Sequence, residues 1–367
     1  MKNKKVDKIF LVTIIFLTIF GFSVFASAAI SLLARDGAKF SSIAFNQTFF
    51  GLFLGSIACF VLSKIHYRIW RKYALLIFIT GISLMLLVFI PTLGFEHNGA
   101  RRWLSIGGIS FQPVEFLKIA FIIYFAAWLS GMKEKTATFR YGLLPFLVII
   151  GIIGAILLKQ PDTDGLVVIA MSGLGIFVTA GARWRDIMIL IFSLIIIITV
   201  TAYFRPYVMN RFVTFLNPSA DSRNSGYQIQ QSLIAIGSGE MFGRGFGQSI
   251  QKFKFLPESM GDSIFAVASE EFGFAGSSFL VLVFVFFVFR GLKIALKSPD
   301  VFGGLLVVGI VILVISQSFI NIASMIGVVP LSGLPLIFFS QGGTAMFFTL
   351  AEMGIILNVS RYRKNNV

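Results

Sequence analysis

Charged residues are scarce in this sequence of 367 residues, at 13%, whereas hydrophobic residues make up 57% of it. A chain with so few charges and a mean hydropathy of +0.89 does not have the composition of a water-soluble protein. At roughly 20 residues per membrane-crossing helix, the apolar content suffices for about ten spans and leaves little for a separate soluble domain. We therefore expect an all-α polytopic membrane protein that forms a single domain over residues 1–367.

Cysteine and histidine are almost absent, since Cys59, His66 and His97 are the only ones. A single cysteine forms no intrachain disulfide, and two histidines exclude a histidine-rich metal site. Acidic residues are also few, 16 against 31 Lys and Arg, which gives a net charge of +15. In a membrane protein such an excess usually marks cytoplasmic loops that face anionic lipid. We therefore expect no nucleic-acid partner.

Apolar runs separated by polar breaks predict ten membrane helices. Their ranges are 9–33, 46–63, 74–93, 114–131, 142–158, 165–181, 187–204, 273–290, 302–326 and 344–360. If the N-terminus is cytoplasmic, Lys and Arg concentrate on every inner connection and are rare on the outer ones, which predicts both termini inside. The N-terminal stretch resembles a signal peptide with Ala26-Ser27-Ala28 as its cleavage site, but its long apolar run favours an uncleaved anchor.

The longest connection, residues 205–272, joins the seventh and eighth predicted helices on the outer side. It is longer than a connection that only links two helices. Most acidic residues of the chain also map to outer connections. We therefore expect a large extracytoplasmic loop that carries the functional chemistry.

Asp262 lies at the predicted membrane boundary, directly before the apolar run 264–267. Low-dielectric surroundings raise the pKa of a carboxylate, and such a group can act as a general base. Ser259-x-x-Asp262 also fits a helix-capping box, in which the carboxylate only satisfies a helix N-terminus. The residues alone leave these two interpretations about even. No second acid shares its helix face, and Glu270 and Glu271 are predicted to be structural partners of outer basic groups.

Charged residues also flank the start of the fourth predicted helix. Arg101 and Arg102 precede Trp103, where they can bind a phosphate or anchor the membrane interface. Glu115 and Lys118 are three residues apart and can touch, which favours a structural ion pair over a functional one. The polar segments 159–165 and 330–344 interrupt helices on the outer side, where irregular backbone must line a cavity or be buried in protein.

These segments together resemble the SEDS family, the FtsW/RodA membrane glycosyltransferases that polymerise peptidoglycan glycan from lipid II. The resemblance covers essentially the whole chain. It is carried by NGARRW at 98–103, FQPVEFLKIA at 111–120, QPD at 160–162, GYQ at 226–228, LPES at 256–259 and DSIFAVASEEFGFAG at 262–276. The run GQSIQKFKFLPE at 247–258 is more similar to the division-type FtsW branch than to the elongation-type RodA branch.

The resemblance implies that Asp262 is the catalytic residue. It further implies that the substrate-binding residues are Arg101, Arg102, Glu115, Lys118, Asp162 and Glu258. The chain departs from the family at 260–263, where it reads MGDS instead of HTDF, and at 340–344, where it reads SQGGT instead of SYGGSS. These departures concern the positioning of the acceptor sugar.

The same resemblance implies a multi-pass protein of the bacterial cytoplasmic membrane. The partners it implies are lipid II, the growing glycan strand, membrane lipid, a class B penicillin-binding protein transpeptidase and other divisome proteins. It allows a divalent cation, Mg or Mn, and no organic cofactor. An elongation-type polymerase, a lipid II flippase or transporter, and a noncatalytic scaffold are the alternatives. Glu352 is the main acidic residue well inside a predicted helix, as a transporter would require.

Overall fold

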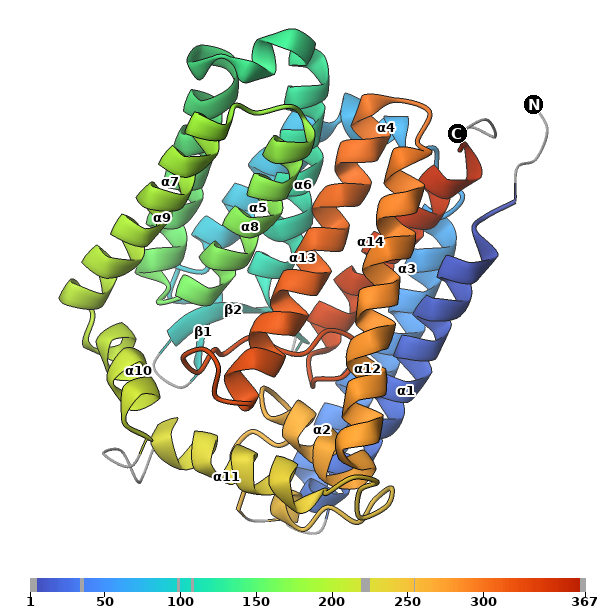
Figure 1. Cartoon of the computed structure of the whole chain (residues 1–367), viewed down its shortest axis with the longest axis vertical. Helices are drawn as coiled ribbons and strands as arrows, with labels where there is room; N and C mark the ends of the chain where they lie inside the picture. The colour runs from blue at the N-terminus through green and yellow to red at the C-terminus, as the bar shows by residue number, and fades with distance from the viewer. Residues whose placement is uncertain are drawn as a thin grey trace.

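The structure is a computed structural model that describes residues 5–33, 36–97, 100–106, 109–218, 225–253 and 255–363. Most of it is a bundle of upright helices, with both chain termini at one end (Figure 1). The helices are α1 (Lys8–Leu33), α2 (Gly37–Phe45), α3 (Gly55–Leu62), α4 (Arg68–Lys72), α5 (Ala74–Leu87), α6 (Pro113–Met132), α7 (Leu144–Lys159), α8 (Thr163–Thr179), α9 (Trp184–Phe204), α10 (Pro206–Leu216), α11 (Ser225–Ser238), α12 (Ile264–Leu296), α13 (Val301–Met325) and α14 (Gly343–Arg361). Short π-helical or 3-10 segments are η1 (Asn46–Leu54), η2 (Lys133–Ala137), η3 (Phe139–Leu143) and η5 (Gln251–Phe253).

Each of the ten predicted ranges coincides with helix. Within the described residues, eight helical stretches are long and apolar enough to cross a membrane: Lys8–Leu33, Gly37–Leu62, Pro113–Met132, Phe139–Lys159, Trp184–Phe204, Ile264–Leu296, Val301–Met325 and Gly343–Arg361. The other two predicted ranges coincide with the shorter apolar helices α5 and α8. The chain is therefore a multi-pass membrane protein, while ten as the number of spans stays a prediction.

The central helix of the bundle is α13, which packs against α12, α8 and α6. Small residues allow this close packing. A Cβ atom on Gly309 of α13 would lie 2.6 Å from Ile176 of α8 and 2.7 Å from Ile122 of α6, so any side chain there would push the helices apart. By contrast, α9 lies at the edge of the bundle, and only 22% of its most apolar window is buried.

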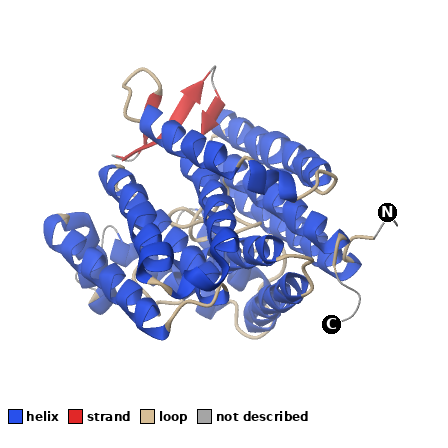
Figure 2. Cartoon of the chain, turned by 90° about the horizontal axis from the view of Figure 1, so that it is seen from above, coloured by secondary structure: helices blue, strands red, loops and turns tan. Residues whose placement is uncertain are grey.

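A small antiparallel sheet departs from the all-α prediction. Its strands β1 (Gly94–His97), β2 (Ala100–Ile106) and β3 (Ile109–Phe111) are ordered β1-β2-β3, with Leu104 opposite both Gly94 and Phe111. The sheet lies at one edge of the bundle (Figure 2). The glycines and arginines of this segment favoured a loop in the sequence. The strands instead satisfy their backbone groups by pairing, with Leu104 buried beneath them.

The connection 205–272 contains α10, α11 and the helical stretch from Ile264 to the kink of α12 at Gly273. The predicted start of the eighth membrane helix at 273 coincides with this kink, while the bounds of the loop stay a prediction. Gly273 interrupts the helical geometry with φ of 68°, and a Cβ on it would lie 2.3 Å from the backbone nitrogen of Gly243. Glu270 and Glu271, just before this glycine, are buried and paired with Arg244 and Lys252, which confirms the prediction that they are structural partners of basic residues.

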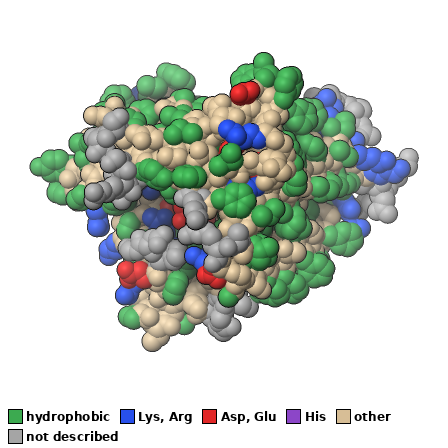
Figure 3. All heavy atoms as spheres, turned by 90° about the horizontal axis from the view of Figure 1, so that it is seen from below, with side chains coloured by type: hydrophobic (Ala, Val, Ile, Leu, Met, Phe, Trp, Pro, Cys, Tyr) green, Lys and Arg blue, Asp and Glu red, His purple; other side chains and the backbone are tan. Residues whose placement is uncertain are grey.

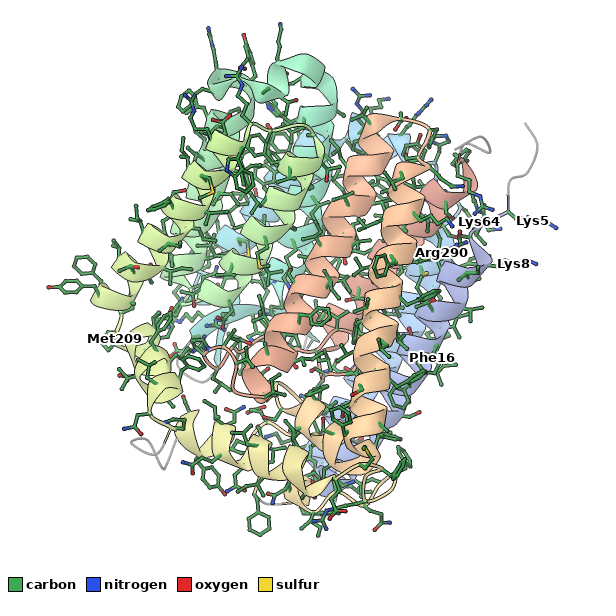
Figure 4. All side chains as sticks on the ribbon, viewed as in Figure 1. Lys5, Lys8, Phe16, Lys64, Met209 and Arg290 are labelled. Carbon is green, nitrogen blue, oxygen red and sulfur yellow. The ribbon has the colours of Figure 1, made fainter. Side chains whose placement is uncertain are left out.

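We call the end of the bundle that carries α10, α11 and the sheet the outer end, and the end that carries the termini the inner end (Figure 1). Lys5, Lys8, Lys64 and Arg290 lie together near the inner end (Figure 4). Termini at the same end are consistent with an even number of spans. The basic residues at that end are those on which the prediction of a cytoplasmic N-terminus rests.

Candidate active site at the outer end

Asp262 lies immediately before α12 at the outer end and is partly buried. The N-cap position belongs to Ser263, whose side chain makes no capping hydrogen bond. The capping-box interpretation of Asp262 is therefore wrong for this structure. Asn321 of α13 holds the Asp262 backbone instead, through a hydrogen bond of 2.7 Å from its side-chain amide to the carbonyl oxygen. No donor among the described residues is hydrogen-bonded to the Asp262 carboxylate, which leaves it available to a substrate.

Its surroundings raise the pKa of Asp262 to about 7. Burial is the main cause, and the negative charges of Glu258 and Asp164 add to it, while Arg211 and Arg102 act in the opposite direction. A carboxyl group with a pKa near neutrality accepts a proton far more readily than an ordinary aspartate does. This is the property that a general base working at neutral pH requires.

Three charged side chains converge around Gly333, in the segment between α13 and α14. A Cβ atom on Gly333 would lie 3.6 Å from Arg211 Nη2, 3.6 Å from Asp164 Oδ2 and 3.8 Å from Asp262 Oδ2. Arg211 Nη1 is 2.7 Å from Asp164 Oδ2, which also accepts a hydrogen bond of 3.1 Å from the Gly333 backbone nitrogen. Asp164 and Arg211 were not among the site residues predicted from sequence, because no pattern in the chain connects positions 47 residues apart.

The two arginines of the NGARRW segment take different places. Arg102 reaches into the bundle and donates to the carbonyl oxygens of Gln160, at 3.1 Å, and Pro161. Arg101 points to the surface and pairs with Glu96, with Nε 3.1 Å from Oε2. Arg102 thus contributes positive charge to the surroundings of Asp262, whereas the structure does not bring Arg101 to this site.

Asp162 and Glu258, both predicted to bind substrate, lie in two different turns. Asp162 is buried and caps α8 by accepting a hydrogen bond of 3.1 Å from the Gly165 backbone nitrogen. Glu258 is exposed, with a positive φ of 48°, in the turn that precedes Asp262. Asp162 therefore shapes the turn that Arg102 holds, and Glu258 adds negative charge beside Asp262.

Glu115 and Lys118 form a buried ion pair inside the bundle, with Lys118 Nζ 2.8 Å from Glu115 Oε1. The same ammonium donates to Gln317 Oε1 on α13 at 2.8 Å, and Gln317 in turn donates to the carbonyl oxygen of Pro335 at 3.3 Å. Gln317 is one helical turn from Asn321, the residue that holds Asp262. The pair is thus joined to the site through α13. Glu352 of α14 is also buried.

A cavity of about 350 Å³ opens beside this site. Its lining comes from α2, η1, the sheet and the start of α14, and includes Gln47, Trp103 and Gln341. Ser340 Oγ donates to the carbonyl oxygen of Gly261 at 2.7 Å, and the Gln341 backbone nitrogen donates to that of Met260 at 2.7 Å. The cavity wall is therefore tied to the turn that carries Asp262, although Asp262 itself is not among the lining residues.

An apolar groove of about 460 Å³ adjoins the cavity and shares Leu54, Phe347 and Phe348 with it. It runs between α3, α5, α6 and α14, and its lining is entirely hydrophobic. The outer end as a whole shows basic and acidic side chains next to one another among hydrophobic ones (Figure 3). The apolar groove therefore adjoins the cavity whose wall is tied to the turn that carries Asp262.

The described part of the chain contains no group of three or more His, Cys, Asp or Glu residues that could hold a metal ion. Asp164, which acts on the Asp262 carboxylate, is already paired with Arg211. A divalent cation therefore stays a prediction.

Comparison with known proteins agrees with this architecture. The model of the FtsW, RodA and SpoVE family, described as cell cycle proteins, matches residues 7–365. Stage V sporulation protein E of Bacillus subtilis is 37% identical over 355 residues, which is 96% of both chains. The probable peptidoglycan glycosyltransferase FtsW of Geobacter metallireducens is 37% identical over 370 residues, covering 98% of this chain and 96% of that one.

Solved structures with the same fold include a chain of a peptidoglycan synthase complex, with a TM-score of 0.80 and 24% identity over 98% of this chain and 99% of that one. The crystal structure of Thermus thermophilus rod shape determining protein RodA has a TM-score of 0.71 and 25% identity, over 98% of each chain. The family model and the relatives each cover almost the whole sequence. This chain therefore belongs to the FtsW/RodA/SpoVE family.

Proposed function

We propose that this protein is a peptidoglycan glycosyltransferase that polymerises lipid II into glycan strands at the outer face of the bacterial cytoplasmic membrane. The observation that carries the proposal is the Asp262 carboxylate, which has a pKa of about 7 and no described hydrogen-bond donor. Relatives that match over nearly their full length are named as probable enzymes of this class. Their FtsW names and the division-type sequence at 247–258 support a role in septal wall synthesis.

In the proposed reaction, a sugar 4-hydroxyl attacks the anomeric carbon of the growing strand. The new glycosidic C–O bond forms as the bond from the anomeric carbon to the diphosphate oxygen breaks, and undecaprenyl diphosphate departs. A neutral hydroxyl is a weak nucleophile, and the ionised Asp262 would take its proton. Because the site is at the end of the bundle, the carboxyl group can then return this proton to water.

Negative charge develops on the departing diphosphate and needs stabilisation. Arg102 and Arg211 are the basic residues whose charge reaches Asp262, so they are placed to favour a phosphate group at this site. Lys118 lies deeper and is already paired with Glu115, so its contribution would pass through the α13 hydrogen bonds. Of the predicted substrate-binding residues, Arg101 has the least support, because it is exposed and paired with Glu96.

The apolar groove suits the prenyl chain of the substrate. It is lined by hydrophobic side chains, and it meets the more polar cavity at Leu54, Phe347 and Phe348. A lipid tail in the groove would place its diphosphate and sugars toward the outer end. We propose a class B penicillin-binding protein as the partner, since one structure with this fold belongs to a peptidoglycan synthase complex that coordinates polymerization and crosslinking. A divalent cation bound to the diphosphate would add positive charge where the leaving group departs.

The test is polymerisation of fluorescent lipid II by the purified full-length protein in vesicles, with and without a class B penicillin-binding protein. Long strands that disappear in Asp262→Asn support the proposal. The control is Glu96→Gln, which also neutralises one carboxylate at the outer end but lies in an exposed ion pair away from the site. Polymer formation that persists at the normal rate in Asp262→Asn would refute the proposal. Lipid II that crosses the vesicle membrane without polymer would instead support the flippase alternative.

A further inference from the structure

The amphipathic helix α10 presents two different faces. Met209, Phe212 and Leu216 are exposed, with Met209 at the edge of the molecule (Figure 4), whereas Val208 is buried. Arg211 follows Val208 by three residues, so it lies on the inward face. Its side chain is 25% exposed, and it points to the charged site. The helix therefore covers one side of the site and carries a cation into it.

The pair of Arg211 and Asp164 links this helix to α8. Among the ion pairs of the described residues, it alone involves α10. Asp164 Oδ2 accepts from both Arg211, at 2.7 Å, and the Gly333 backbone nitrogen, at 3.1 Å. One carboxylate oxygen thus connects α8, α10 and the segment before α14. These three elements surround Asp262 on the side of Gly333.

The two partners act on Asp262 with opposite signs. Four charged groups influence its carboxylate: Glu258 and Asp164 oppose its ionisation, and Arg211 and Arg102 favour it. Glu258 is exposed in the preceding turn, and Arg102 is held by the carbonyl oxygens of Gln160 and Pro161. Asp164 and Arg211 form an ion pair with each other, so their opposite electrostatic effects on Asp262 act from the same place.

We propose that Arg211 and Asp164 are a matched pair of positioning residues, which holds α10 over the site and balances the charge around the Asp262 carboxylate. This inference rests on the proposed function, in which Asp262 must be ionised to accept a proton. Breaking the pair does more than loosen α10, because it leaves one uncompensated charge beside Asp262. The sign of that charge depends on which partner is removed.

The two single neutralisations therefore have opposite consequences. In Arg211→Gln, the unpaired Asp164 carboxylate disfavours a second negative charge, so Asp262 loses its proton at higher pH. In Asp164→Asn, the unpaired guanidinium favours the negative charge, so Asp262 loses its proton at lower pH. An uncompensated charge beside a carboxylate shifts the pKa of that carboxylate by about one unit. A helix that was merely loosened would move the pH profile in the same direction in both variants.

The experiment is the pH dependence of kcat/KM for lipid II polymerisation by the full-length protein in vesicles, from pH 5.5 to 8.5. The acid limb is the part of this pH profile in which kcat/KM rises with pH. We expect it to move to higher pH by about one unit in Arg211→Gln and to lower pH by about one unit in Asp164→Asn. In the double variant the limb should return toward the wild-type position. The control Glu96→Gln removes one carboxylate from an exposed pair with Arg101 and should leave the limb in place.

Arg211→Lys and Asp164→Glu keep the charges and provide the measurement if a neutral variant fails to fold. Their acid limbs should stay within about 0.3 units of the wild type, because the charge balance is retained. Limbs that stay fixed in both neutral variants, or that move together, would overturn the inference while leaving the proposed function intact. The proposed function itself fails separately, if Asp262→Asn still polymerises lipid II.

Discussion

Asn321 on α13 joins Asp262 to the segment before α14. Its side-chain amide donates to the carbonyl oxygen of Asp262 at 2.7 Å and to that of Leu334 at 2.8 Å. Gln317, one turn earlier on the same helix, accepts a hydrogen bond from Lys118. The central helix thus holds both the candidate base and the buried ion pair, through two side chains one turn apart on the same face.

Replacing Asn321 by alanine should slow polymerisation about tenfold to a hundredfold, because it frees the backbone on both sides of the base. It also leaves two buried carbonyl oxygens without this donor, at a cost of about 1–3 kcal/mol. Polymerisation rates and thermal unfolding in detergent measure the two effects. Ser318→Ala is the matched control, since Ser318 is buried on the same helix but bonds only to Val314 within it. Equal rate losses in both variants would contradict a specific role for Asn321.

The pH dependence of the wild-type reaction should show a single ionisation. Burial and the neighbouring acids raise the pKa of Asp262 to about 7, so the ionised fraction increases between pH 6 and 8. We expect kcat/KM to rise about tenfold per pH unit at pH values below the pKa of Asp262 and to level off at pH values above it. A rate that is independent of pH across this range would show that Asp262 is not the group that limits the reaction.

The same shift predicts how Asp262 affects stability. Its pKa is higher in the folded protein than the value of 3.8 for an unperturbed aspartate, so ionisation disfavours the folded state, and the loss of stability develops between about pH 4 and 7. Asp262→Asn should therefore unfold at a higher temperature than the wild type at pH 8, and the difference should shrink at acidic pH. Thermal unfolding at pH 5 and pH 8 measures this. A variant that is less stable than the wild type at pH 8 would contradict the expected cost of the charge.

Arg102 and Arg101 should differ in their effects on activity. Arg102 holds two carbonyl oxygens of the turn before α8, so Arg102→Ala removes both the hydrogen bonds and a charge that favours the ionised Asp262. We expect at least a tenfold loss of kcat/KM for Arg102→Ala and a clearly smaller one for Arg101→Ala. Arg102→Lys should recover only part of the activity, because an ammonium does not reproduce the fork of two donors. Equal losses at both positions would restore Arg101 to the binding site.

Breaking the buried pair of Lys118 and Glu115 should be costly. Lys118→Met leaves the Glu115 carboxylate buried without its cation, which typically costs about 3–5 kcal/mol. The double variant Glu115→Gln, Lys118→Met should recover much of this loss, because no unpaired charge remains. Thermal unfolding of the two single variants and the double variant gives the coupling directly. Additive losses would mean that the two side chains do not depend on each other.

Much of the protein could be predicted from sequence because the membrane imposes simple rules. Apolar runs of about 20 residues located helix in each of the ten predicted ranges, though not α10 or α11, since a helix satisfies its own backbone groups in lipid. The position of Asp262 before the apolar run at 264–267 likewise indicated a carboxylate at the edge of a low-dielectric region. These features are local, so the order of residues along the chain was enough to reveal them.

Only the tertiary structure decided which groups surround Asp262. Arg211, Asp164 and Gly333 come from distant parts of the chain, and their meeting depends on how α10, α8 and the segment before α14 pack. Glu270 and Glu271 could be predicted to pair with basic groups, but only the packing shows that their partners are Arg244 and Lys252. Hydrophobic periodicity determines where helices form, whereas the pairing of buried charges is determined by their packing.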